Sequence, residues 1–178
     1  MNYHLIKGKD TALSKKASTA CYYIKGLCAW TNRDLETARD NFLLVIDRFE
    51  QNPLLIKELP KRYTRVLNNL LMYYVDCQDF DSFFEYLNKM KSLVKKDGFR
   101  SIDMQIRLFS FTRIAELLAY ESMGEHDKGE KIIEKILQGI ATFKPKISKE
   151  DVIVFYYYIS RFYFGSGDFK KSLEYINK

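Results

Sequence analysis

Histidine and cysteine are the side chains that most often pair for nucleophilic catalysis or bind transition metals, so their spacing is the first test for chemistry. This sequence has two histidines, His4 and His126, and three cysteines, Cys21, Cys28 and Cys77. Neither the His-x-x-x-His nor the Cys-x-x-Cys spacing occurs. We therefore expect no metal site, and no Cys–His pair, because nothing in the sequence brings His126 near a cysteine.

Paired carboxylates and glycine-rich loops are the other common sources of chemistry. Glu130 and Glu134 stand four residues apart, but Lys131 and Lys135 alternate with them, which is typical of a solvated helix face with ion pairs. The segment Gly165-Ser166-Gly167 follows an expected helix and lacks the lysine of a phosphate-binding loop. The sequence thus predicts no catalytic residue, no cofactor and no enzymatic activity.

Basic residues form two groups that could contact nucleic acid. The net charge is +6, and aromatic residues beside cations can bind single strands by stacking and charge. The first group is Lys57, Lys61, Arg62 and Arg65, and the second is Lys89, Lys91, Lys95, Lys96 and Arg100. Because the surplus is spread thinly along the chain, we expect most of these charges to solvate outer helix faces, and nucleic-acid binding stays an alternative.

An internal repeat organises the chain. Four similar short segments recur at spacings of 45, 46 and 43 residues, each with an acidic residue at the start of an apolar-periodic run: Asp34, Asp79, Glu125 and Asp168. Each acidic side chain is expected to cap the helix that follows it. Gly124 and Gly167 suit the left-handed residue that ends the helix before. Each segment is therefore expected to be a tight turn between two antiparallel helices.

The apolar periodicity on both sides of these turns predicts an all-α fold, with no convincing strand alternation. Breakers separate the pairs at Asn52-Pro53, Pro60, Gly98 and Lys144-Pro145, and Ser148 with Asp151 predicts a capping box. The expected helices are 11–32, 34–51, 60–77, 80–97, 101–123, 126–143, 149–165 and 168–178. They form four hairpins, 11–51, 60–97, 101–143 and 149–178, in one domain over residues 1–178.

The last expected helix is shorter than its counterparts and ends on Tyr175-Ile176-Asn177-Lys178 without a polar cap. Stacks of helical repeats normally need a polar terminal cap to stay in solution. We therefore expect the chain to be a piece of a longer protein, or to cover this end by binding a partner or a second copy of itself.

At the turns the sequence resembles the tetratricopeptide-repeat family, which places a glycine on the first helix and Ala-x-x-x-Phe on the second. Gly26 and Ala38-x-x-x-Phe42 match this pattern in the first unit, and Gly167-Asp168-Phe169 resembles the turn of the last. The period here exceeds the family's spacing of about 34 residues. The resemblance implies a right-handed superhelical stack of about four hairpins, a tetratricopeptide-like α-solenoid.

The resemblance also implies a binding surface. Members of the family bind peptides or proteins in a concave groove lined by the first helix of each pair, and some hold a C-terminal carboxylate with Lys, Arg and Asn. The matching positions place these residues toward or beside that groove: Tyr23, Leu27, Arg65, Asn68, Asn69, Met72, Tyr157 and Arg161. Arg65, Asn68 and Asn69 come nearest to a carboxylate clamp, although the full set is absent.

The resulting hypothesis is a scaffold that binds a protein or peptide of unknown identity in its groove. Three alternatives stay open: a basic helical-repeat nucleic-acid binder, the peptide-sensing half of a regulator, and a self-assembling structural module. No apolar run approaches the roughly 20 residues of a membrane-spanning helix, and the first residues do not resemble a signal peptide. We therefore expect a cytoplasmic protein with reduced cysteines.

Overall fold

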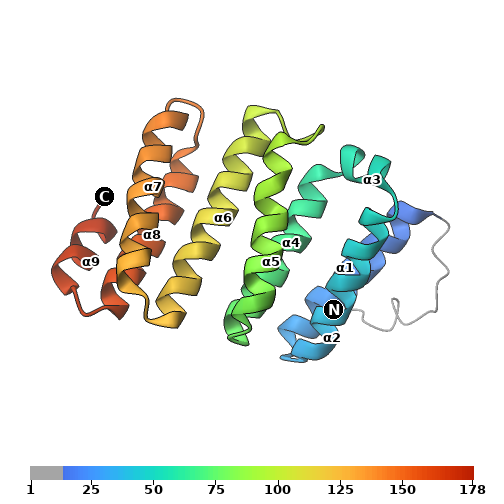
Figure 1. Ribbon diagram of the computed structural model, residues 1–178, viewed down its shortest axis with the longest axis horizontal. Helices are drawn as coiled ribbons and strands as arrows, with labels where there is room; N and C mark the ends of the chain where they lie inside the picture. Colours follow the sequence, from blue (N-terminus) through green and yellow to red (C-terminus); the bar gives the residue numbers. More distant parts are fainter. Residues whose placement is uncertain (1–13) are drawn as a thin grey trace.

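The computed structural model describes residues 14–178, and over that range the chain is all-α, as the periodicity predicts (Figure 1). Its α-helices are α1 (Lys15–Thr31), α2 (Leu35–Glu50), α3 (Pro53–Glu58), α4 (Pro60–Asp76), α5 (Phe80–Ser92), α6 (Ile102–Met123), α7 (His126–Phe143), α8 (Lys149–Gly165) and α9 (Phe169–Ile176). One 3₁₀ turn, η2 (Leu93–Lys95), follows α5. Within the described residues there is no strand and no helix long and apolar enough to cross a membrane.

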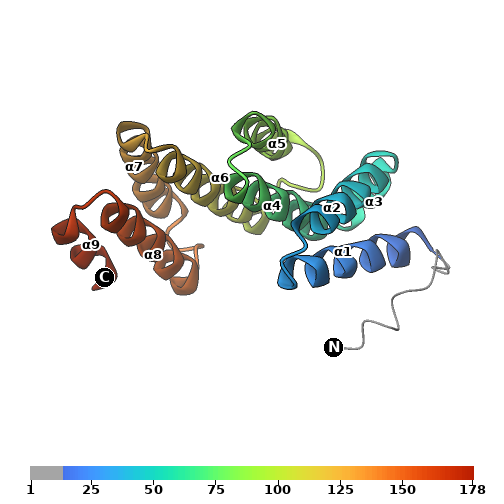
Figure 2. The same ribbon diagram turned by 90° about the horizontal axis from the view of Figure 1, so that it is seen from below.

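Consecutive long helices pack as pairs, α1 with α2, α4 with α5, α6 with α7 and α8 with α9. The pairs are joined through α2 with α4, α4 with α6, and α6 with α8. Figure 1 shows the pairs following one another in one row, from α1 with α2 at one end to α8 with α9 at the other. Seen end-on in Figure 2, the row is bent, with α5 and α7 on its outer side and with α1 and α8 at the inner ends.

Acidic caps begin three of the four second helices, as the repeat predicts. The side chains of Asp34, Asp79 and Asp168 accept hydrogen bonds from the backbone N–H three residues on, at 3.2, 3.1 and 3.0 Å. The prediction is wrong for Glu125, which makes no side-chain cap and instead pairs with Lys128 at 3.0 Å. The longer glutamate side chain reaches past the first amides of the helix, so α7 begins without this hydrogen bond.

A left-handed residue precedes each capping position. Gly124 and Gly167 take this conformation at φ of 70° and 82°, as expected, while Arg33 and Gln78 take it at 63° and 56° in the other two turns. In L-residues this region brings Cβ against the carbonyl oxygen, an unfavourable contact that glycine lacks.

Replacing Arg33 or Gln78 by glycine is therefore expected to raise the free energy of unfolding by about 0.5–1 kcal/mol each, since relief of strain outweighs the extra freedom of the unfolded chain. Denaturant titration measures the change. Asn32→Gly is the matched control, because Asn32 has a φ of −85° and gains nothing from glycine. Destabilisation at Arg33 and Gln78 equal to that at Asn32 would contradict the strain argument.

The prolines begin helices as well as separating them. Pro53 and Pro60 are the first residues of α3 and α4, where a missing N–H removes no hydrogen bond. The short helix α3 was not among the expected helices, because both prolines were treated only as breakers between the hairpins. The fourth expected helix, 80–97, also ends early, since α5 stops at Ser92 and one 3₁₀ turn follows. Residues 11–13 of the first expected helix lie outside the described range.

The predicted capping box at the start of α8 is present in part: Ser148 caps the helix, but no hydrogen bond from its backbone N–H to Asp151 is found in the described residues. The hydroxyl of Ser148 accepts a hydrogen bond from the backbone N–H of Asp151 at 3.0 Å and donates to the Asp151 carboxylate at 2.9 Å. The Asp151 carboxylate thus accepts its hydrogen bond from the side chain of Ser148 and not from the backbone N–H of Ser148. This geometry fixes the start of α8 and the last residues of the loop before it.

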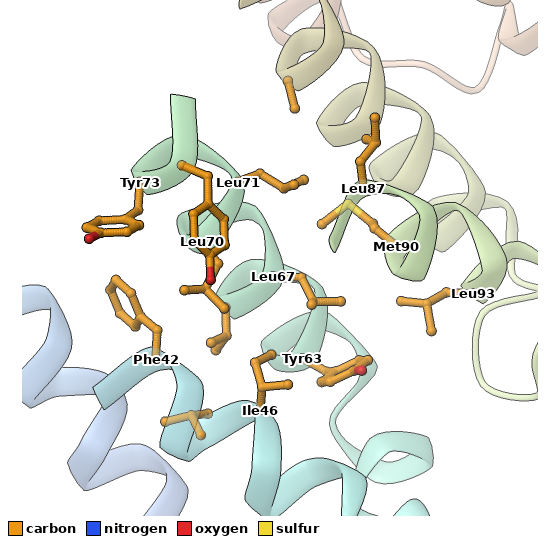
Figure 3. Packing of buried hydrophobic residues seen from close by; sticks show 14 of the residues in the cluster. Phe42, Ile46, Tyr63, Leu67, Leu70, Leu71, Tyr73, Leu87, Met90 and Leu93 are labelled. Carbon is orange, nitrogen blue, oxygen red and sulfur yellow. The ribbon is translucent and has the colours of Figure 1, made fainter. Parts of the chain in front are cut away.

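Buried side chains form two clusters, one over α1–α5 and one side of α6 from Met104 to Ala119, the other over α6–α9. Figure 3 shows the first cluster, in which Phe42 and Ile46 of α2 face Leu67 and Leu70 of α4. Glycines permit the closest approaches between helices. A Cβ on Gly26 would lie 2.6 Å from the ring of Phe42, and one on Gly129 would lie 2.2 Å from the ring of Phe162.

Candidate functional site

Two adjoining hollows lie along the first helices of the pairs. The first, about 620 Å³, lies between α1 and the start of α4, and Tyr23, Arg62 and Arg65 are among its lining residues. The second, about 310 Å³, lies where α4, α6 and α8 begin, and its lining includes Arg107 and Ser110 of α6. Lys61 lines both hollows. We call the two together the basic groove.

The cations of the basic groove are available to a ligand. They are Lys61, Arg62, Arg65, Arg107 and Lys146. Within the described part of the chain, none of these five side chains forms an ion pair.

The acidic residues of the basic groove are partly engaged elsewhere. Glu58 pairs with Lys16 at 2.6 Å, and the carboxylate of Asp151 accepts from Ser148. The third acidic residue, Asp103, lies in the first turn of α6, where a negative charge is favourable. The groove therefore presents more unpaired positive than unpaired negative charge.

Aromatic rings and buried polar groups complete the surface. Tyr23 packs on Phe42, with ring centroids 6.0 Å apart, and its hydroxyl accepts a hydrogen bond from Asn69 Nδ2 at 3.4 Å. In the second hollow the guanidinium of Arg107 lies 5.5 Å from the centre of the Phe111 ring. A partner would thus meet rings and charges on one continuous surface, the combination that anchors many interfaces.

Three of the residues predicted for the groove come together. Tyr23 and Arg65 line the first hollow, and Asn69 bonds to Tyr23 from the neighbouring helix. Asn68 and Met72 are half-buried further along α4, where spacings of three and four residues keep them on the side of Arg65. Leu27, one turn beyond Ile24 of the hollow, is 36% exposed.

The other two predicted residues lie apart from this group. Tyr157 and Arg161 stand one turn apart on α8 and line neither hollow of the basic groove. Tyr157 is 52% exposed and packs against Tyr158, and Arg161 pairs with Glu121 of α6 at 3.4 Å. Their role in binding stays a prediction.

Sequence reasoning did not assign the remaining groove residues to the groove. Lys61 and Arg62 belonged to a basic group considered for nucleic acid, while Arg107, Ser110 and Lys146 were not singled out. The signal for Arg107 and Ser110 is their spacing of three on one helix face. Lys146 lies in the loop before α8. It lines the same hollow as Arg107 because α6 and α8 begin close together, and the sequence alone gives no sign of that contact.

Three of the five cations in the second basic group are paired within the described chain, while Lys95 and Lys96 take part in none of its ion pairs. Lys89 pairs with Glu50 at 2.9 Å, Lys91 with Glu116 at 2.6 Å, and Arg100 with Asp97 at 3.2 Å. Glu50 also accepts a hydrogen bond from the Tyr63 hydroxyl at 2.9 Å. Burial, and to a lesser extent this hydrogen bond, raises the pKa of Tyr63 above its usual value, so the hydroxyl keeps its proton and remains a donor. Paired cations offer less charge to phosphates than the free cations of the basic groove do.

Comparison with known proteins gives a likeness of fold. No family model matches the sequence, and no curated protein matches it. The chain is similar in fold to the crystal structure of BtubC (BKLC) from P. vanneervenii, with a TM-score of 0.64 and 16% sequence identity. The similarity covers 92% of this chain and 62% of that one, so this chain spans less than two thirds of that protein. An identity this low supports the shared fold alone.

Proposed function

We propose that this chain is a scaffold that binds a protein or peptide along the basic groove, on the inner side of a tetratricopeptide-like stack of helical hairpins. The observation that carries the proposal is the set of unpaired cations on α4, on α6 and in the loop before α8, which line the same two hollows as Tyr23 of α1 and Phe111 of α6. A surface that crosses four helices suits an extended polypeptide better than a single small molecule.

The close packing of the first pair supports the tetratricopeptide-like interpretation. Gly26 and Phe42, which carry the resemblance in sequence, meet in space, since the ring of Phe42 fills the place that a Cβ on Gly26 would take. Ala38, one turn before Phe42, is fully buried. The bent row of Figure 2 supports a curved stack of hairpins.

Nucleic acid is the second candidate, because the basic groove is positive and includes aromatic rings. The ion pairs of Lys89, Lys91 and Arg100 reduce the charge that the second basic group offers to phosphates, which supports a polypeptide over a strand that needs many phosphate contacts. The two candidates differ in salt dependence, since a phosphate-driven complex loses affinity steeply as salt rises.

Affinity capture from a cell lysate, with and without nuclease, tests the proposal. The groove variant carries Arg62→Gln and Arg65→Gln. The matched control carries Lys131→Gln and Lys135→Gln, which removes the same charge from exposed positions on α7. We expect a discrete protein that survives nuclease, is retained by the control, and is depleted about tenfold or more by the groove variant, as for interface anchors.

Two results would contradict the proposal. One is a signal that disappears with nuclease, which would move the assignment to nucleic acid. The other is equal depletion of the captured protein by the groove variant and by the control variant, which would show that overall charge, and not the basic groove, governs binding.

A further inference from the structure

Ser110 is a buried polar residue with no hydrogen-bond partner in the described structure. It is 8% exposed on α6, and its hydroxyl is one of two buried side-chain polar atoms without a partner in the described residues, the other being Arg113 Nε. Other buried hydroxyls of this chain are satisfied: Thr112 donates to the carbonyl of Leu108 at 2.7 Å, and Ser160 donates to the carbonyl of Ser172 at 2.8 Å. Buried polar groups are nearly always hydrogen-bonded, so the hydroxyl of Ser110 requires an explanation.

The hollow beside Ser110 is rich in positive charge. Arg107 stands one turn before Ser110 on the same helix face, Lys61 reaches the hollow from α4, and Lys146 reaches it from the loop before α8. Two carboxylates also line it, those of Asp103 and Asp151. The hydrogen bond from Ser148 leaves the charge of Asp151 in place, so the lining carries three positive and two negative charges, a net excess of one positive charge.

The ends of three helices also contribute to the electrostatic potential of the hollow. Lys61 is the second residue of α4, Asp103 the second of α6 and Asp151 the third of α8, so three helices begin at the rim of the hollow. The N-terminal end of a helix carries a partial positive charge, which favours an anion nearby. Asp103 and Asp151 already supply a negative charge in the first turns of α6 and α8, whereas α4 has no acidic residue in its first turn and no side-chain cap. Ile106 and Phe111 supply apolar walls, which suit the aliphatic part of a side chain.

We propose that this second hollow binds the anionic end of a side chain, a carboxylate or a phosphate, with Ser110 donating a hydrogen bond and Arg107, Lys61 and Lys146 supplying charge. The side chain would belong to the polypeptide held in the basic groove, so the source of the ligand rests on the proposed function. The site itself does not depend on that function, because it is built from residues within one hollow.

Amide nuclear magnetic resonance of the ¹⁵N-labelled chain tests the site with small probes. The two anions are N-acetyl-glutamate amide and N-acetyl-O-phosphoserine amide, and the neutral control is N-acetyl-glutamine amide. We expect saturable shifts at Arg107, Ser110 and Phe111 with an anion and none with the glutamine probe. The anion that binds more tightly identifies the carboxylate or the phosphate as the natural group. Equal shifts with the neutral probe would overturn the site.

Variants separate a binding role of Ser110 from a structural one. Arg107→Gln is expected to weaken anion binding about tenfold, as loss of a charge-assisted contact does, while Lys131→Gln leaves it unchanged. Ser110→Ala is expected to weaken binding and to leave the melting temperature equal or higher, because it removes an unsatisfied buried hydroxyl. A lower melting temperature with unchanged anion binding would show that Ser110 serves packing alone and would overturn the proposal.

The two proposals fail in distinguishable ways. If the anions bind but capture finds no partner for the groove, the site stands and the scaffold function fails. If the anion shifts persist unchanged in Arg107→Gln while capture still depends on Arg62 and Arg65, the scaffold function stands and this site fails.

Discussion

Phe42→Ala is expected to lower the free energy of unfolding by about 3–5 kcal/mol, the usual cost of removing a fully buried ring. Phe42 has no exposed surface and contacts Tyr23 and Trp30 of α1, with ring centroids 6.0 and 5.9 Å apart. Loss of the ring leaves a cavity between α1 and α2 that the glycine at position 26 cannot fill. Chemical denaturation followed by circular dichroism measures the change.

Leu44→Ala is the matched control for Phe42→Ala, because Leu44 lies on the same helix and is 44% exposed. We expect it to cost about 0.5 kcal/mol or less, as exposed substitutions do. Gly26→Ala should also destabilise, and its cost should fall in a Phe42→Leu background, since the two positions share one space. Independent, additive costs would contradict the direct contact.

Glu116→Gln is expected to lower the free energy of unfolding by about 2–3 kcal/mol, because it removes one partner from a buried ion-pair network. The Glu116 side chain is 6% exposed and lies 2.6 Å from both Lys91 Nζ and Arg113 Nη1. The two cations are 39% and 25% exposed, so water screens part of their unpaired charge and keeps the effect below that of a fully buried pair. Thermal and denaturant unfolding both measure this loss.

The control for Glu116→Gln is Glu134→Gln, an exposed residue on α7 whose loss should change stability by no more than about 0.5 kcal/mol. Replacing all three members of the network by apolar residues should cost less than removing Glu116 alone, because no buried charge is then left without a partner. Equal effects of Glu116→Gln and Glu134→Gln would show that the network contributes nothing to stability.

Local chemistry explains why so much of the fold could be predicted from the sequence. Asp34, Asp79 and Asp168 fix helix starts through their own side chains, and glycine fixes the left-handed turn at Gly124 and Gly167. Each of these signals acts within a few residues. Two errors have different causes. Proline breaks a helix and also begins one, and glutamate has the charge of aspartate but a side chain too long for the same cap.

The site was less accessible to sequence reasoning because it depends on helix ends that are distant in the chain. Tyr23, Arg65 and Asn69 could be placed by their positions in the repeat. Lys61, Arg107 and Lys146 lie 46 and 39 residues apart in sequence, and they line one hollow only because α4, α6 and α8 begin at the same edge of the row. The residue spacing within a single helix does not indicate that these three side chains lie close together.

Site-specific photo-crosslinking inside cells tests the central claim, that a polypeptide partner binds in the basic groove. A benzoyl-phenylalanine would replace Ile24, which lines the first hollow and is 38% exposed, and in a separate variant would replace Lys135 on the exposed side of α7. We expect a discrete crosslinked protein from position 24 and none from position 135. Crosslinks from position 135 alone would place the partner on the outer surface and contradict the proposed groove.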